Sequence, residues 1–414
     1  QTMITELKIT NFRSLREVWL DNLQPVNLLI GPNNSGKSNI LKALKFFSEF
    51  LGGNVPGKDE LQPLFFRVVQ EREQIESAPL SLQFHSELSD KITPMGYGGV
   101  SIFHSNYSTE VSPFAVTLAK SKRAYDNFAI EDVEFLDKSS DEFEAYYYYN
   151  YEGIIPPSTE YVKKTTGNGH RGELYLKNND EKTVGKTLPD PSLGYLRTSF
   201  QKQIFAPLDN LKIYRPEPSK LLDLYPIQNE QSVNEDAGNL VAFLQVMRNR
   251  YQYIFDRITN DLRRFVPEFT SISFDLVDEP PKELREKYNN KSLAKIGLTD
   301  KFGRIFWADS LSEGTLYFLS LLCITHQPEP PKLLLLEEPE KGIHPRRIRE
   351  TMDLIFELAA EKNIQVILTT HSTAVVDTFA DIPEAVYIVE RVAQQTTVKN
   401  LQRDVIEPHN EQFK

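Results

Sequence analysis

The sequence is poor in cysteine, tryptophan and methionine, and it contains no long apolar run. Its 414 residues include one cysteine, two tryptophans and four methionines. The single cysteine, Cys323, excludes an internal disulfide and is typical of a reducing compartment. The leucine run at 333–336 is strand-sized, far short of the ~20 apolar residues that span a membrane. Residues 3–9 alternate polar and apolar side chains and lack the apolar core of a secretory signal. We therefore expect a cytoplasmic protein that makes no contact with a membrane.

A net positive charge is also absent. The formal net charge is −11, which counts against a protein that coats nucleic acid, although a local basic patch could remain. The composition, 40% hydrophobic and 25% charged, is that of a globular protein. The length exceeds the size at which one hydrophobic core stops growing, so two lobes are expected. Gln1 and Thr2 precede Met3 and are not counted in the predicted lobes.

Apolar periodicity predicts regular structure at both ends of the chain. Near the start it predicts strands at 4–9, 17–20 and 26–30, then a helix at 38–50. Later it predicts a helical segment at 239–265, a strand at 272–276, a helix from Ser312, a strand from Leu333, a helix from Pro345, a strand from Ile364 and a strand near Val386. Such alternation is typical of α/β proteins with a largely parallel sheet.

The middle of the chain, residues 55–205, has a different character. It holds short apolar runs among turn residues, and six prolines between 189 and 226 exclude a long continuous helix there. The tyrosines at 146–149 and Tyr151 could form a platform for stacked bases, but strand propensity explains them more simply. There is no internal repeat and no heptad run.

A glycine-rich loop follows the predicted strand at 26–30 and precedes the predicted helix. Its sequence at 31–38, Gly-Pro-Asn-Asn-Ser-Gly-Lys-Ser, is a complete Walker A motif. The glycines let backbone N–H groups point at a β-phosphate, and the helix N-terminus adds its positive end. Lys37 would reach the β/γ oxygens and the Ser38 hydroxyl would bind Mg²⁺. We therefore expect ATP and Mg²⁺ as cofactors, with the nucleotide held by Gly31, Pro32, Asn33, Asn34, Ser35, Gly36, Lys37, Ser38 and Asn39.

Two acids and a histidine follow later strands. Glu337 and Glu338 come directly after the leucine run, as in a Walker B motif. Glu337 would hold Mg²⁺, and Glu338 would act as general base toward the attacking water. Most such strands carry aspartate at the first position, so Glu337 is expected to alter the metal geometry slightly. His371 follows the predicted strand from Ile364, where an imidazole can hydrogen-bond a γ-phosphate. The expected catalytic residues are thus Lys37, Glu338 and His371.

The segment 311–315, Leu-Ser-Glu-Gly-Thr, opens a helix ahead of these acids. It resembles the ABC signature motif in the variant of RecF/OLD-like ATPases, the AAA15/AAA21 group. The opening residues 9–14 resemble the N-terminal strand of that group, whose arginine, Arg13 here, tends to lie near nucleotide. Residues 337–345 are similar to its Walker B motif and D-loop, 369–372 to its H-switch, and 236–240 to the start of its second lobe. The resemblance covers 3–60 and 235–395 and leaves the Q-loop glutamine open, with Gln70 and Gln83 as candidates.

The resemblance implies a nucleotide site shared between two copies of the chain. In this group the signature of one protomer contacts the γ-phosphate held by the other. Ser312 and the Gly314 N–H group, at a helix start, form an anion site without a phosphate of their own. We therefore expect a head-to-tail dimer that closes on ATP, and higher oligomers are compatible with the sequence.

The expected fold class is α/β: an ABC-type P-loop ATPase head with a mixed sheet and a large α+β insertion between the Walker A and signature motifs. The predicted parts are an N-lobe at 3–60, an insertion at 61–230 that senses a trigger or binds a partner, a C-lobe at 231–402 and a tail at 403–414. The long interval before residue 311 disfavours a transporter subunit, and the missing heptads disfavour an SMC protein with coiled-coil arms.

The remaining class, OLD/RecF-like ATPases, is common in antiphage defence. Residues 372–414 are too few for a Toprim nuclease domain, and the seven histidines show no HNH or zinc spacing. The favoured hypothesis is the ATPase subunit of a two-component defence system with a separate effector nuclease or toxin. The alternative is a RecF/SMC-like DNA-repair or recombination ATPase. The arginines at 346, 347 and 349 could contact nucleic acid or a partner, although such a helix start is more often simply solvated.

Overall fold

A computed structural model of the chain describes residues 2–51, 80–88, 94–104, 143–150, 160–166, 173–177, 206–222, 224–277, 279–341 and 343–412. The chain forms two compact units. The first unit comprises Gln1–Leu23, Asn34–Leu208 and Glu390–Val398, and the second comprises Gln24–Asn33, Asp209–Val389 and Lys399–Lys414. The chain passes between them inside the glycine-rich loop, after Asn33.

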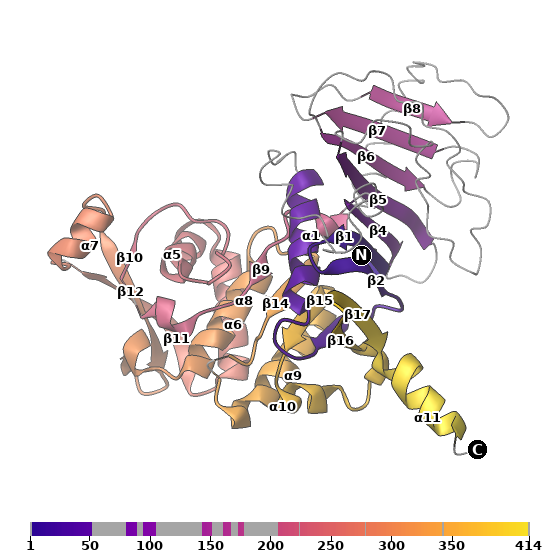
Figure 1. The fold of residues 1–414 in the computed structure, drawn as a ribbon. Helices are drawn as coiled ribbons and strands as arrows, with labels where there is room; N and C mark the ends of the chain where they lie inside the picture. Colours follow the sequence, from indigo (N-terminus) through magenta and orange to yellow (C-terminus); the bar gives the residue numbers. More distant parts are fainter. Residues whose placement is uncertain are drawn as a thin grey trace. The chain divides into compact units, whose positions relative to one another are not determined.

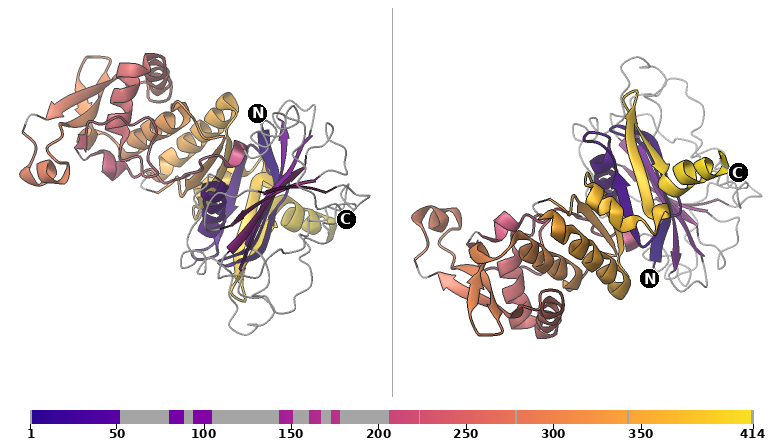
Figure 2. Two further views of the ribbon diagram at one scale, coloured as in Figure 1. Left: turned by 90° about the horizontal axis from the view of Figure 1, so that it is seen from above. Right: turned by 90° about the horizontal axis from the view of Figure 1, so that it is seen from below.

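The first unit contains an antiparallel sheet whose described strands run in the order β2-β1-β4-β5-β6-β7-β8 (Figure 1). Figure 2 shows the same strands from two further sides as a twisted layer. Their bounds are Thr2–Phe12 (β1), Leu15–Leu20 (β2), Leu80–Leu88 (β4), Pro94–His104 (β5), Phe143–Asn150 (β6), Glu160–Thr166 (β7) and Glu173–Lys177 (β8). The tyrosines at 146–149 lie in β6, which confirms the strand interpretation, and Tyr151 lies outside the described residues.

Helix α1, Lys37–Leu51, lies against β1 and β4 of this sheet. The predicted helix at 38–50 is confirmed, and its apolar face is fully buried: Ile40, Leu41, Leu44 and Phe47 are all 0% exposed. In β1 a register shift between Ile4 and Glu6 brings Ile4 to the buried side with Leu7 and Ile9, although strict alternation would place it on the opposite face.

The second unit contains most strands of the predicted parallel sheet, and most residues of its last strand, β17, belong to the first unit. Its sheet order is β17-β16-β3-β15-β14-β9, and β9, β14, β15, β3 and the start of β16 pair in parallel. The bounds are Val26–Ile30 (β3), Ile213–Tyr214 (β9), Leu333–Glu337 (β14), Gln365–Thr370 (β15), Val386–Val392 (β16) and Gln395–Asn400 (β17). The four leucines of β14 and all of β15 are buried, as in strands covered on both faces. The α/β prediction is therefore confirmed.

A smaller antiparallel sheet belongs to the same unit. Its order is β10-β12-β11, with β13 also pairing β12. The strands are Tyr225–Pro226 (β10), Phe269–Val277 (β11), Leu293–Asp300 (β12) and Ile305–Trp307 (β13). Gly297 of β12 leaves room for the Trp307 ring, because a Cβ there would lie 2.6 Å from the indole.

Four longer helices complete the second unit: α5 (Leu240–Arg250), α6 (Gln252–Phe265), α8 (Glu313–His326) and α9 (Pro345–Lys362). Short helical turns lie at Ala206–Leu208, Pro218–Leu221, Lys282–Lys287 (α7), Ala308–Ser310, Thr373–Val376 (α10), Asp377–Phe379, Pro383–Ala385, Leu401–Ile406 and Glu407–Gln412 (α11). Within the described part of the chain, no helix is long and apolar enough to cross a membrane.

The helical segment predicted at 239–265 is confirmed, but it consists of two helices that meet at Tyr251. The Tyr251 N–H group donates to Met247 O and ends α5, while its carbonyl accepts from Ile254 and Phe255 and begins α6. Its φ of −126° and ψ of 54° lie outside the helical region and break the helix without a proline or glycine. Apolar periodicity continues through such a break, so the sequence pattern could not reveal it.

Helix α8 is apolar on all sides, and every residue from Gly314 to His326 is buried. Cys323 lies inside it, and burial raises the pKa of its thiol well above the ordinary value. A buried thiol of this kind is an inert structural residue.

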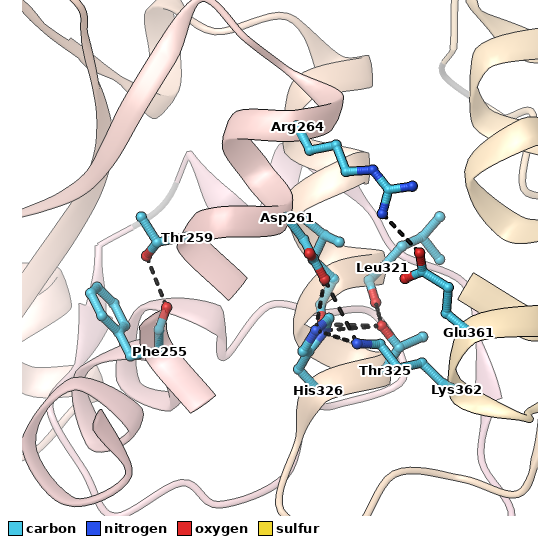
Figure 3. A network of polar contacts seen from close by, with 10 residues as sticks. Phe255, Thr259, Asp261, Arg264, Leu321, Thr325, His326, Glu361 and Lys362 are labelled. Atoms are coloured by element: carbon cyan, nitrogen blue, oxygen red, sulfur yellow. Dashed lines mark hydrogen bonds and ion pairs between the residues drawn. The ribbon is translucent and has the colours of Figure 1, made fainter. Parts of the chain in front are cut away.

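At its C-terminal end, α8 carries a buried histidine in a polar network (Figure 3). His326 Nδ1 donates to Leu322 O over 2.9 Å, and Nε2 lies 2.9 Å from both Lys362 Nζ and Asp261 Oδ2. Burial, and then the neighbouring Lys362 cation, lowers the pKa of His326 below its ordinary value, against the opposing effect of Asp261. His326 is therefore neutral in the folded chain, and Nε2 accepts the Lys362 ammonium hydrogen.

Lowering the pH should destabilise the protein through His326. The unfolded chain takes up a proton on this histidine near pH ~6.5, whereas the folded chain resists it, so the free energy of unfolding falls as the pH drops below that value. The effect of one group is at most roughly 1.4 kcal/mol per pH unit. Urea unfolding between about pH 7.5 and about 5.5 should show a shallower pH dependence in His326→Gln than in the wild type. His344→Gln, at an exposed histidine, is the control, and a His326→Gln slope equal to it would contradict the assignment.

Candidate functional site

Three predicted residues meet at the carboxyl edge of the parallel sheet. Ile30 of β3 is in register with Thr370 of β15, and Thr369 is in register with Glu337 of β14. Gly31, His371 and Glu338 each directly follow one of these strands, so they emerge at the same edge. Ligands of open α/β sheets bind outside this edge, and the structure confirms that these groups adjoin there.

His371 connects the loop after β3 to the acid after β14. Its Nε2 lies 2.7 Å from Glu338 Oε1, and its Nδ1 lies 3.1 Å from Gly31 O. A carboxylate and a carbonyl are both acceptors, so the imidazole donates from both nitrogens unless the carboxyl group carries the proton. Glu338 has a φ of 49°, and its N–H group donates to Thr369 O over 3.0 Å. The turn that follows Glu337 thus aims the second acid at His371.

Glu340 fixes the backbone of this turn. Its Oε1 accepts the Thr370 hydroxyl at 2.5 Å and the His371 N–H group at 3.2 Å. The Ser372 N–H group in turn donates to Thr370 Oγ1 over 2.9 Å. A carboxylate in the segment predicted as the D-loop therefore positions the histidine that contacts Glu338.

Arg215 also contacts Glu338, and the sequence reading missed it. It follows β9, which pairs with β14 in parallel through Tyr214 and Leu336. Its Nη2 lies 3.7 Å from Glu338 Oε2, and its buried Nε has no hydrogen-bond partner among the described residues. The strand next to β14 therefore delivers an arginine to the second acid, whereas the two candidates for the Q-loop glutamine lie elsewhere. Gln83 lies in β4 of the first unit, and Gln70 lies outside the described residues.

The second half of the glycine-rich loop, residues 34–38, belongs to the first unit and is anchored by Thr396. Thr396 Oγ1 donates to Ser35 O over 2.9 Å, and its N–H group donates to Ser14 O over 2.8 Å. Gly36 has a φ of 111°, and a Cβ there would clash with the Thr396 side chain. Only glycine fits this position, so the loop conformation depends on Gly36.

The other predicted residues of the loop differ in exposure. Pro32, Asn33 and Asn34 are exposed, and Gly31 and Ser38 are half-buried. Lys37 begins α1 and is only 4% exposed. The Asn39 side chain donates to Ser14 Oγ over 2.8 Å, so it supports the loop in the first unit.

Arg13 precedes Ser14 at the β1–β2 turn. It is exposed, with a φ of 53°, and its guanidinium lies 5.6 Å from the centre of the Phe12 ring.

The loop and the acids fit a nucleotide with Mg²⁺. The Ser35 hydroxyl is buried without a partner among the described residues, as expected of a group that a phosphate would satisfy. Across the same residues there is no group of three His, Cys, Asp or Glu side chains that could hold a metal. Mg²⁺ commonly uses one or two protein oxygens plus substrate phosphates, and the Ser38 hydroxyl and the Glu337 carboxylate are each oxygen donors of the kind that Mg²⁺ binds.

The predicted signature segment forms the N-terminus of α8. Ser312 is the N-cap, and its Oγ accepts from the Thr315 N–H group over 3.1 Å. Ser312 is exposed and Gly314 is buried. Arg347 of α9 donates from Nη1 to Ser312 Oγ over 3.0 Å. The expectation that arginines 346, 347 and 349 are simply solvated is therefore wrong for Arg347.

Comparisons with known proteins place the chain among P-loop ATPases. Residues 26–95 and 141–377 match the family described as "AAA domain, putative AbiEii toxin, Type IV TA system". A stretch of 47 residues is 49% identical to an uncharacterized protein of Methanocaldococcus jannaschii, covering 11% of this chain and 22% of that protein. Another of 87 residues is 33% identical to the phosphonates import ATP-binding protein PhnC 1 of Rhodopseudomonas palustris, covering 21% and 30%. The chain thus spans less than a third of these relatives.

Among solved structures, the SMC head domain from Thermotoga maritima is similar over 96% of this chain and 98% of that chain. The sequence identity is 13% and the TM-score is 0.43.

Arg215→Met should slow ATP hydrolysis by roughly tenfold or more. The variant would lose a charge-assisted contact between Arg215 and the γ-phosphate of ATP, and such a contact is worth ~1.5–3 kcal/mol. ADP should bind as in the wild type, since ADP carries no γ-phosphate for Arg215 to contact. Steady-state phosphate release and ADP titration measure the two quantities. Lys220→Met removes an exposed cation from the same segment and should change neither. If Arg215→Met hydrolyses ATP at the wild-type rate, Arg215 does not contribute to the site.

Proposed function

Because the chain belongs to the AAA-domain family that residues 26–95 and 141–377 match, we propose that it is a Mg²⁺-dependent ATPase whose active site is completed by a second copy of the chain. The observation that carries this proposal is the contact of His371 with both Gly31 and Glu338 at the carboxyl edge of the sheet. This pair of contacts brings together the start of the glycine-rich loop, the candidate base Glu338 and an imidazole that could hydrogen-bond a γ-phosphate.

Glu338 is the general base in this proposal. One of its oxygens lies against His371 and the other faces Arg215, so it must be released before it can accept a proton from water. A γ-phosphate would attract the arginine and an imidazolium away from the carboxylate, because it offers more charge and more acceptor oxygens. ATP binding would thereby free the base only when a γ-phosphate is present.

The remaining roles follow from the positions of the side chains. Lys37 would neutralise the β/γ oxygens, and the loop N–H groups would bind the β-phosphate. Ser38 and Glu337 would hold Mg²⁺, which when bound neutralises phosphate charge. Asn39 supports the loop through Ser14, and Arg13 is exposed at the adjacent turn.

The dimer is supported by the N-terminus of α8. Ser312 is exposed and caps the helix by accepting the Thr315 N–H group, so an external anion would meet a hydroxyl and the positive end of the helix there. A phosphate held by a second copy fits this chemistry, which makes the proposed dimer head-to-tail. Each dimer then contains two sites, each built from the loop of one chain and the signature segment of the other.

Mixing two inactive variants tests the composite site. Lys37→Ala removes the loop cation, and Gly314→Asp places a carboxylate where the partner's phosphate would bind. Each variant alone should be inactive, whereas a mixed dimer has one site with both halves intact. With random pairing and independent sites, phosphate release should recover to roughly a quarter of the wild-type value. No recovery at any ratio, while each variant stays folded by circular dichroism, would overturn the dimer.

The finer proposal is that this ATPase acts in the cytoplasm as the sensor or regulatory subunit of an antiphage defence system. The description of its family refers to a toxin of a type IV TA system, which supports control of a separate effector, a nuclease or toxin. The interval 61–230 is proposed to bind the trigger or the partner. Arg215 lies inside that interval but beside Glu338, so the proposal is confined to the part before residue 206.

DNA stimulation distinguishes this role from a RecF/SMC-like repair ATPase. The net charge of −11 opposes binding to duplex DNA. We therefore expect duplex DNA to leave phosphate release unchanged and the product of a neighbouring gene to change it. The measurement is ATP turnover with DNA, with the partner, and with both. Strong stimulation by DNA alone would favour the repair ATPase.

A further inference from the structure

Arg347 lies over the start of the signature helix. It belongs to α9, the helix that follows the turn after Glu338, and its side chain is 30% exposed. Nη1 donates to Ser312 Oγ over 3.0 Å, and the guanidinium carbon lies 5.6 Å from the centre of the Phe318 ring. A Cβ on Gly314 would meet Arg347 Cδ at 3.4 Å, so the glycine lets the arginine approach the helix.

The hydrogen bonds around Ser312 fix the direction of its hydroxyl. Its oxygen accepts from the Thr315 N–H group over 3.1 Å and from Arg347 Nη1 over 3.0 Å. A hydroxyl has two lone pairs, so both are used. The third neighbour, Thr315 Oγ1 at 2.8 Å, must then accept the Ser312 hydrogen. The Ser312 hydrogen is thus donated to the neutral Thr315 hydroxyl, and an anionic phosphate oxygen would compete for that hydrogen while Arg347 and the Thr315 N–H group keep both lone pairs of Ser312 occupied.

The arginine is itself held in place. Its Nε donates to Glu350 Oε2 over 3.1 Å, one turn further along α9, while the ring of Phe318 lies beneath the guanidinium. Cation–π contact and a side-chain ion pair both restrict a residue that would otherwise be mobile. Lysine could supply one hydrogen bond but could not bond Ser312 and Glu350 from one planar group.

We propose that Arg347 is a positioning residue of the composite ATP site: it holds the Ser312 hydroxyl as a donor toward the γ-phosphate bound by the second copy of the chain. The inference rests on the proposed function. Arg347 acts through Ser312, so its loss weakens the closed dimer and leaves the affinity of a single protomer for nucleotide unchanged.

The experiment uses the full chain in the Glu338→Gln background, where loss of the base slows hydrolysis by about 10²–10⁴-fold and preserves ATP. Sedimentation velocity with MgATP measures dimerisation, and titration with MgADP measures nucleotide affinity of the protomer. Arg347→Met should weaken dimerisation by roughly tenfold or more, because a charge-assisted hydrogen bond is lost. Its affinity for MgADP and its thermal midpoint should match the reference, and Arg347→Lys should recover part of the dimerisation.

Two further variants separate positioning from a general charge effect. Arg349→Met removes an exposed cation from the same helix and should leave dimerisation unchanged. In a Ser312→Ala background, Arg347→Met should add little further loss, since the two residues act as one unit. Additive losses would overturn the positioning role.

The outcomes also separate this inference from the function it depends on. If the Glu338→Gln reference does not dimerise with MgATP, the proposed function fails and the inference fails with it. If the reference dimerises and Arg347→Met dimerises equally well, the inference alone is overturned.

Discussion

The parallel pairing of β3, β15 and β14 is the constraint on which the candidate site depends. It places the first residue after each strand at one edge of the sheet, where Gly31, His371 and Glu338 come into contact. A slip of one residue in either pairing would turn each side chain to the other face. The buried apolar strands oppose such a slip, because it would move their packed side chains as well.

Charged neighbours fix the hydrogen bonding of the Glu338 carboxylate and the Ser312 hydroxyl, the two groups that the proposed chemistry would use. Glu338 lies between His371 and Arg215, which hold the candidate base until something more anionic competes for them. Ser312 is fixed as a donor instead of an acceptor. Its oxygen already accepts hydrogen bonds from Arg347 and the Thr315 N–H group, so its hydroxyl can only donate to a further partner. Both arrangements rely on pre-oriented polar groups, so little reorganisation is needed when phosphate arrives.

Much of this site could be predicted from the sequence, because its motifs follow strong apolar strands. The leucines before Glu337 predict a buried strand that ends at the acids, and the Gly-Lys-Ser at 36–38 predicts a phosphate loop that leads into a helix. Arg215 could not be found this way, because β9 has only two residues in a proline-rich stretch and gains its place by pairing with β14. Thr396 and Arg347 were missed for a related reason: each acts through a contact distant in sequence. The break at Tyr251 leaves no mark on periodicity.

The anchor of the glycine-rich loop has a consequence for how the chain folds during synthesis. Thr396 of β17 holds Ser35 and Ser14, and it follows Ser35 by 361 residues. Strand β3 likewise pairs with β15 and β16, which are made much later than β3 itself. The ribosome releases the N-terminal segments long before these partners exist. The loop can therefore take up its nucleotide-binding form only after β17 has been made. A nascent chain would be protected from premature ATP binding by the order in which its strands are made.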